Sequence, residues 1–390
     1  MIANEIEEGF CCEKEEIVSF IEALKMDMPD TRDNRGKRHD VVFIIVCFLL
    51  ATLSGRHRLS SIHRFICNRL HWLRTVTHFQ DAQFISRAHL PRLLGRLDWA
   101  VLNEIIGGCF GVRIEENAKK EWMAIDGKAL RGSQSGDDRQ SIVFAVKHET
   151  RETVGQARQI GTKSSEIPVV RALLKETGLE AQKVSLDAHH CNPETTAQIH
   201  NADGIYLVQV KENQAALLQQ CEELSTTHPA MIEINEDDKA NGRVTSRCAR
   251  FFSMAQEPVA PRWKESGLTT LVVVIRETCQ RSRQKTMTDT SYYVSNQTVG
   301  QDNIESAEDL TQAIQKHWGV ESNNWIRDVT FNEDKIKVKA GNQGQIMGRL
   351  RGLAIELIRK TGIKNFQAAV ERFIDSPSAL ELMLRQVKFL

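Results

Sequence analysis

Apolar residues in the first 115 positions recur every three or four residues, which is the spacing of amphipathic helices. The pattern predicts helices at 13–26, 41–54, 58–70, 81–95 and 98–108. The most apolar run, Val41–Leu53, is 13 residues long, whereas a membrane-spanning helix needs roughly 20 residues. We therefore expect this run to be a buried core helix, no membrane span, and an all-α domain over residues 1–115.

After residue 115 the pattern changes to short apolar strands separated by turns and helices. In order, we expect strands at 122–126, 142–148 and 153–160, a helix at 164–177, a strand at 184–187, a helix at 193–201 and a strand at 204–211. This order predicts an α/β fold whose mixed sheet has flanking helices. It is the ribonuclease-H-like arrangement rather than a doubly wound one.

The remaining third of the chain is less regular. Residues 213–290 mix helical and strand patterns, and Tyr292–Ser295 reads as a further strand. Ser306-Ala-Glu-Asp309 resembles a capping box and predicts the start of a long helix. Residues 346–390 are expected to form two or three amphipathic helices.

Asp126 and Asp187 are each predicted at the end of a short apolar strand. Ligand sites in α/β sheets gather at the carboxyl ends of strands, where side chains can point into an open crevice. Two such carboxylates in one sheet therefore indicate a candidate metal site. The alternative is that both aspartates begin turns, a position that Asp favours and that Gly127 after Asp126 would suit.

Glu321 is the third candidate, because it interrupts the apolar side of the predicted long helix. That side consists of Leu310, Ile314, Trp318 and Trp325. A carboxylate that faces the core is costly unless it is paired or bound to a cation. Glu321 is therefore either a metal ligand or the partner of an arginine such as Arg327 or Arg131.

Glu333 and Asp334 are rivals to Glu321 for the third ligand position. They lie beyond the predicted end of the helix, so we expect them in a solvated turn. A trio of carboxylates offers only oxygen ligands, which suit Mg²⁺ or Mn²⁺ and not zinc. Such a trio can hold two ions about 3.5–4 Å apart, an arrangement that serves phosphodiester displacement.

The formal net charge of zero hides a strong asymmetry along the chain. Residues 1–30 carry nine acidic and two basic side chains, whereas residues 31–113 carry thirteen Lys and Arg against five Asp and Glu. A basic block of this kind predicts a surface that binds DNA phosphates, although ordinary solvated helices rich in arginine would give the same count. The arginines expected to contact phosphates are Arg56, Arg58 and Arg64. Near the predicted metal site, Lys128, Arg131 and Lys211 are expected to hold the DNA backbone.

Five segments together resemble the H-repeat-associated insertion-sequence transposases. Residues 124–133 (AIDGKALRGS) resemble the first catalytic motif of that family, and residues 185–195 (SLDAHHCNPET) resemble the second. Residues 206–214 resemble the strand that follows it, and residues 317–334 resemble the third motif. Residues 30–38 and the apolar helix after them resemble the N-terminal associated domain. The resemblance covers about residues 20–360.

The resemblance implies a DDE transposase with a ribonuclease-H-like catalytic domain at 116–345, interrupted by an insertion at about 213–290. It implies that Asp126, Asp187 and Glu321 bind two Mg²⁺ ions, for which Mn²⁺ can substitute. The family's Tyr, Arg and Lys around the catalytic Glu are absent, because Ile314, His317 and Asp328 hold those places. The roles of those side chains are therefore not carried over, and only a phosphate contact is suggested for His317.

Such an enzyme would hydrolyse phosphodiesters at the ends of its element and transfer the strands into target DNA. Its partners would be double-stranded DNA carrying terminal inverted repeats, target DNA, and at least a second copy of the chain. The nine cysteines include no C-x-x-C pair, which favours reduced thiols in a bacterial cytoplasm, at the nucleoid when DNA is bound. The alternatives are a ribonuclease-H-like DNA nuclease and a domesticated DNA-binding protein derived from a transposase.

Overall fold

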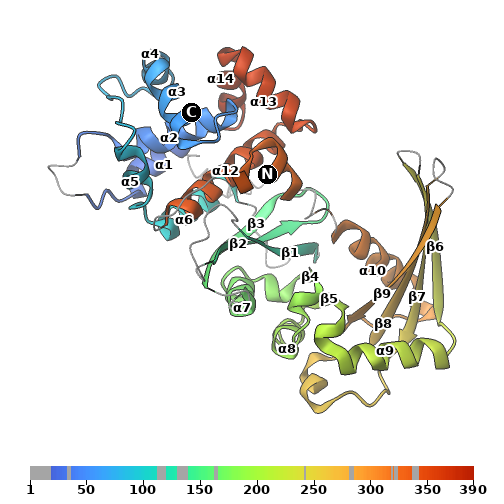
Figure 1. Ribbon diagram of the computed structural model, residues 1–390. Helices are drawn as coiled ribbons and strands as arrows, with labels where there is room; N and C mark the ends of the chain where they lie inside the picture. Colours follow the sequence, from blue (N-terminus) through green and yellow to red (C-terminus); the bar gives the residue numbers. More distant parts are fainter. Residues whose placement is uncertain are drawn as a thin grey trace, which may run out of the picture.

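The computed structural model describes residues 19–32, 37–111, 120–129, 139–161, 166–240, 243–280, 285–317, 319, 324–335 and 342–390. These residues form a helical unit, a central sheet with helices on both faces, and an extension of that sheet (Figure 1). None of the helices within these ranges combines the length and the apolar content that a membrane span requires.

The described N-terminal residues are helical, as the sequence predicted. The helices are α1 (Phe20–Asp27), α2 (Val41–Leu53), α3 (Leu59–Asn68), α4 (Leu70–Thr77), α5 (His89–Leu94) and α6 (Trp99–Phe110). Helix α2 begins after Asp40, whose side chain accepts a hydrogen bond from the Phe43 amide and so caps the helix. All residues of α2 are buried, which confirms the prediction of a core helix.

One predicted helix is shorter in the structure, and one helix was not predicted. The segment expected at 81–95 is helical only over α5. Pro91 lacks a backbone N–H and is tolerated only in the first turn of a helix, so the helix has to begin shortly before it. Helix α4 was not predicted, because Thr75, Val76 and Thr77 are poor helix formers. Burial of Leu73 and Val76 in the core outweighs that propensity.

The C-terminal helices share their hydrophobic core with the N-terminal ones. They are α12 (Gln343–Lys360), α13 (Phe366–Asp375) and α14 (Pro377–Gln386). One continuous cluster of buried side chains runs from Phe20 in α1, through α2 and α12, to Leu384 in α14. Figure 1 shows the red C-terminal helices beside the blue N-terminal ones. The two ends of the chain therefore fold as one helical unit, with α12 enclosed between that unit and the sheet.

The central sheet confirms the predicted mixed α/β fold of the ribonuclease-H-like type. Its strands are β1 (Trp122–Ala129), β2 (Arg139–Lys147), β3 (Thr153–Gly161), β4 (Lys183–Leu186) and β5 (Ile205–Val210). They lie in the order β3-β2-β1-β4-β5. β1, β2 and β3 pair antiparallel, whereas β4 pairs parallel to both β1 and β5.

Helices cover both faces of this sheet. Helices α7 (Glu166–Glu176) and α8 (Pro193–Asn201) pack on one face, where Met123 and Ile125 of β1 are buried. Helix α10 (Ile304–His317) packs on the other face, against Trp122. Helix α12 contacts β2. Because side chains alternate along a strand, Asp126 shares the face of Trp122 and therefore points to the side of α10.

The residues between β5 and α10 extend the sheet. Helix α9 (Ala215–Thr227) leads into an antiparallel meander of β6 (Ile232–Ala240), β7 (Arg243–Ser253), β8 (Thr270–Gln280) and β9 (Lys285–Ser295). The end of β9 pairs antiparallel with β5, from Leu207 opposite Ser295 to Val210 opposite Tyr292. The mixed region at 213–290 and the strand at Tyr292 thus belong to one sheet extension, shown at the right of Figure 1.

The long helix after this extension differs from its prediction in two ways. Helix α10 begins at Ile304, so Ser306 lies inside its first turn, where it is buried, rather than capping it. Leu310 and Ile314 are buried against the sheet as expected, but Trp325 is 61% exposed. The apolar stripe predicted for the long helix therefore does not extend to Trp325, which immediately precedes a π-helical turn at Ile326–Thr330.

Candidate active site

The pairing of β1 with β4 places Asp126 and Asp187 side by side. In the parallel register Ile125 lies opposite Leu186, and each aspartate is the next residue of its strand. Neighbouring strands lie about 4.8 Å apart, so the two carboxylates are adjacent at one end of the parallel pair. Asp187 follows the last residue of β4, as predicted. Asp126 does not end its strand, because β1 continues to Ala129 through its pairing with β2.

Asp126 lies in a partly buried, negatively charged setting. The Asn324 side-chain amide donates a hydrogen bond to its Oδ2 at 2.9 Å. Burial, followed by the charge of Asp187, raises the pKa of Asp126 to about 6, and the charge of Glu166 adds to the rise. The bond from Asn324 lowers the same pKa only in part. A cation bound beside Asp126 would favour the ionised form of this carboxylate.

Asp187 begins the short loop that leaves the sheet. Its side chain accepts a hydrogen bond from the backbone amide of His190 at 3.3 Å and so caps the turn at Ala188–His190. Two side chains from the start of α9 fasten this loop: Asn213 donates to the Ala188 carbonyl and Gln214 to the Cys191 carbonyl. The Asp187 side chain stays 45% exposed, so it is held in place and remains accessible from the crevice.

A chain of three side chains ties the end of α10 to β4. The Ser185 hydroxyl lies 2.8 Å from His148 Nε2 and 2.8 Å from His317 Nδ1. Burial lowers the pKa of His317 to about 4 and that of His148 to about 3, so both rings are neutral at pH 7. A neutral, internally bonded His317 does not support the suggested phosphate contact. Its position instead fixes the end of α10 just before the segment that holds Glu321.

The other residues singled out from the sequence divide into two groups. Glu321, Trp318 and Arg131, and the side chain of Lys128, lie outside the described residues. Arg56, Arg58, Arg64 and Lys211 are exposed. Lys211 follows β5, whose Val208 pairs with Leu186, so it lies near the edge that carries Asp187.

The expectation for Glu333 was wrong. Glu333 opens a short 3₁₀ turn, as predicted, but it is only 4% exposed and forms an ion pair with Arg327 at 3.6 Å. The Arg327 guanidinium lies over the ring of Phe144, 4.1 Å from the ring centroid. Glu333 therefore balances a buried arginine. Asp334 is partly buried beside it.

Sequence reasoning missed Asn324 and the Ser185–His148 bond. It also missed Asn213 and Gln214, which hydrogen-bond to the loop after Asp187. Asn324 carried one usable signal: it lies three residues after Glu321, and residues three apart share a face of a helix. The other contacts join segments far apart in the sequence, so no local pattern could have found them.

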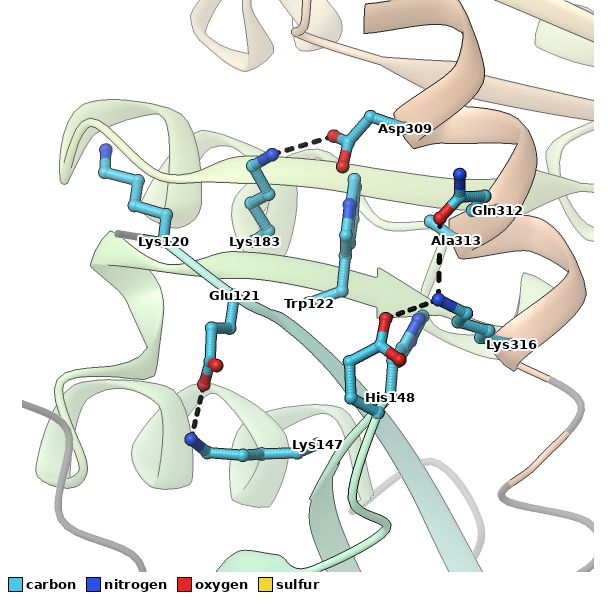
Figure 2. A pocket seen from close by; sticks show the side chains of 11 residues that line it. Lys120, Glu121, Trp122, Lys147, His148, Lys183, Asp309, Gln312, Ala313 and Lys316 are labelled. Atoms are coloured by element: carbon cyan, nitrogen blue, oxygen red, sulfur yellow. Dashed lines mark hydrogen bonds and ion pairs between the residues drawn. The ribbon is translucent and has the colours of Figure 1, made fainter. Parts of the chain in front are cut away.

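A pocket of about 240 Å³ opens at the opposite end of β1, around Trp122 (Figure 2). Lysines lie around it, and each has a partner. Lys147 pairs with Glu121, Lys183 with Asp309, Lys316 with Glu149, and Lys120 with the Asp203 carbonyl. These pairs hold β1, β4 and α10 together at the end of the sheet away from Asp126, so the pocket is a structural junction.

The donor set around Asp126 fits a hard divalent cation. Both carboxylates offer oxygen, and the Asn324 Oδ1 next to them is buried with no hydrogen-bond partner among the described residues. Across the described residues no three His, Cys, Asp or Glu side chains are already arranged to hold a metal ion. The third carboxylate predicted from the sequence, Glu321, lies outside those residues.

Comparison with known proteins gives the family. A family model described as Transposase DDE domain matches residues 117–355, and a model described as DDE_Tnp_1-associated matches residues 22–108. "Putative transposase YncI" of Escherichia coli O157:H7 is 26% identical over 361 residues, covering 88% of each chain. "H repeat-associated putative transposase YhhI" of Escherichia coli strain K12 is 25% identical over 360 residues, covering 88% of this chain and 91% of its own. The chain therefore belongs to the Transposase DDE domain family, as its motifs predicted.

Proposed function

We propose that this chain is a DNA transposase that cuts phosphodiester bonds at the ends of its element and joins the freed 3′ ends to target DNA. The observation that carries the proposal is the placement of Asp126 and Asp187 on adjacent parallel strands, facing α10. Glu321, four residues beyond the end of α10, is proposed as the third carboxylate.

The three carboxylates are proposed to hold two Mg²⁺ ions, with Mn²⁺ as a substitute. Bound there, the ions would stabilise charge on the attacking and leaving oxygens of an in-line displacement. The residues of the chain hold the proposed ligands in place. β1 and β4 fix the spacing of Asp126 and Asp187, and the Ser185–His317 bond fixes the end of the helix that leads to Glu321.

DNA is proposed to lie across the exposed arginines of the helical unit and to reach the active site along Lys211. Arg56 and Arg58 flank the start of α3, and Arg64 lies within it, so the three cations belong to one segment. Phosphate contacts of this kind supply affinity without reading sequence. Because two element ends have to be joined in one event, the active form on DNA is proposed to be at least a dimer.

Removal of any one proposed ligand should abolish cleavage. We expect Asp126→Asn, Asp187→Asn and Glu321→Gln each to lower Mg²⁺-dependent cleavage of element-end DNA by orders of magnitude while binding to that DNA persists. Ca²⁺ should permit binding without cleavage. Asp289→Asn, an exposed carboxylate on β9, is the control and should cleave normally. Retained cleavage in one of the three variants would remove that residue from the site.

The raised pKa of Asp126 predicts a pH-dependent penalty in the metal-free protein. The folded pKa of about 6 lies above the ordinary aspartate pKa of 3.8, so the stabilising contribution is present below pH 3.8 and is lost as the pH rises through 6. Two pKa units correspond to about 3 kcal/mol at most. Asp126→Asn should therefore raise the melting temperature at pH 8 in metal-free buffer and change it little near pH 4.

Addition of Mn²⁺ at pH 8 supplies the control for this stability measurement. The cation should raise the melting temperature of the wild-type chain and leave that of Asp126→Asn almost unchanged, because binding to the folded state stabilises only a protein that has the site. An Asp126→Asn variant that is less stable than wild type at pH 8 would contradict the proposed charge repulsion.

The exposed arginines should govern the salt dependence of DNA binding. Each phosphate contact that is lost lowers the slope of log Kd against log salt concentration by about 0.9. We expect Arg56→Ala, Arg58→Ala and Arg64→Ala in the full-length chain each to flatten the slope by about that amount. Arg250→Ala on β7 is the matched control. Slopes equal to wild type in all three variants would place the DNA elsewhere.

A further inference from the structure

Behind Asp187 lies a buried pair of ionisable side chains, Glu166 and His190, for which the proposed chemistry has no use so far. His190 follows Asp187 by three residues and is 1% exposed, and Glu166 is 8% exposed. His190 Nε2 lies 3.1 Å from Glu166 Oε1 and 3.9 Å from Asp187 Oδ1. One imidazole nitrogen therefore faces two carboxylates.

The chemistry of the pair fixes the direction of its hydrogen bond. A carboxylate oxygen accepts hydrogen bonds, so the N–H of His190 Nε2 donates this one to Glu166. Asp187 Oδ1, 3.9 Å from the same nitrogen, lies beyond hydrogen-bond distance. Glu166 thereby orients the ring of His190, and the backbone amide of His190 donates a hydrogen bond to the Asp187 carboxylate at 3.3 Å. Hydrogen-bonding groups around a metal site orient its ligands, and their loss typically costs roughly 10- to 100-fold in metal affinity.

Glu166 also contacts the strand that carries Asp126. A side-chain carbon built on Gly127 would lie 2.0 Å from Glu166 Oε1, far inside any allowed contact. A larger residue after Asp126 would displace the Glu166 carboxylate, which lies close to the Gly127 backbone. One side chain thus touches Gly127, next to Asp126, and His190, in the loop of Asp187. Glu166 therefore contacts both segments that set the spacing between Asp126 and Asp187.

A purely local role for Glu166 does not account for these contacts. A carboxylate in the first turn of α7 is favoured by the partial positive charge of the helix N-terminus. An exposed glutamate would satisfy that preference equally well. Burial of a carboxylate and an imidazole is costly unless each finds a partner, and here the partners are each other and the two aspartate-bearing segments.

We propose that Glu166 is a positioning residue which, through His190 and Gly127, fixes the spacing of Asp126 and Asp187 for divalent cation binding. The proposal rests on the proposed function, because it takes both aspartates as metal ligands. It assigns Glu166 no direct bond to a cation. The distinction is testable, because a positioning role depends on the hydrogen bond to His190 whereas a ligand role depends on charge.

The test is the affinity of the full-length chain for Mn²⁺, measured by electron paramagnetic resonance of the free ion at pH 7.5. Glu166→Gln keeps an oxygen that can accept the His190 bond and removes the charge. Glu166→Asp keeps the charge and withdraws it from His190 by one methylene. We expect Glu166→Gln to bind Mn²⁺ nearly as wild type and Glu166→Asp to bind it roughly 10- to 100-fold more weakly.

His190→Ala should weaken Mn²⁺ binding as much as Glu166→Asp does. The double variant should bind Mn²⁺ about as weakly as either single variant, because both substitutions break the same contact between Glu166 and His190. Glu180→Gln is the matched control: Glu180 also accepts a side-chain hydrogen bond, from Gln198, but it lies outside this cluster. The Glu180→Gln variant should bind Mn²⁺ with the affinity of the wild-type chain. Melting temperatures of all variants separate a loss of folding from a loss of binding by the folded chain.

Several outcomes would overturn the proposal. Glu166→Asp binding Mn²⁺ better than Glu166→Gln would make Glu166 a ligand or a source of charge. Equal binding by wild type, Glu166→Asp and His190→Ala would remove the pair from the site, and an equal loss in Glu180→Gln would make the effect nonspecific. Asp126→Asn and Asp187→Asn separate this failure from failure of the proposed function. If those two variants bind Mn²⁺ normally, the proposed metal site itself is wrong, and with it the premise of the inference.

Discussion

The parallel pairing of β1 with β4 is the constraint on which the active site depends. It puts Ile125 opposite Leu186 and leaves one aspartate after each, at the same level and on the same face of the sheet. A shift of this register by one residue would turn one carboxylate to the opposite face. Burial of Met123, Ile125, Val184 and Leu186 against α7 and α8 prevents such a shift. The hydrophobic core on one side of the sheet thus specifies the chemistry on the other.

The two aspartates place negative charge in a partly buried setting, and neighbouring side chains offset part of its cost. Repulsion and burial raise the pKa of Asp126 to about 6, and Asn324 offsets this only in part. Neutral His148 and His317 tie α10 to β4 through Ser185 without adding charge. Without a cation, ionised Asp126 lowers the stability of the fold, whereas a bound cation would raise it. The stability of the metal-free chain is thus linked to the proposed activity.

The sequence predicted those parts of the fold that depend on local pattern. Apolar runs located β1, β4 and β5, and the order of elements predicted the ribonuclease-H-like sheet. The same reasoning could not show that α12–α14 share a core with α1–α6, because that contact joins residues more than 200 positions apart. Pairing of β9 with β5 could not be predicted either, because it joins residues more than 80 positions apart in the sequence.

The candidate site was predicted unevenly. Strand ends identified Asp126 and Asp187, although β1 runs on past Asp126 because β2 still pairs with it. Helical periodicity did not predict the exposure of Trp325, which immediately precedes a π-helical turn. Glu333 was expected in solvent because no local pattern reveals that Arg327 is buried over Phe144 and has to be balanced.

The position of Mn²⁺ in crystals of the full-length chain, located by anomalous scattering, tests the proposed metal site. We expect two peaks about 3.5–4 Å apart, both bonded to Asp126, Asp187 or Glu321. Peaks beside Glu333, or density at neither aspartate with Mn²⁺ bound elsewhere, would contradict it.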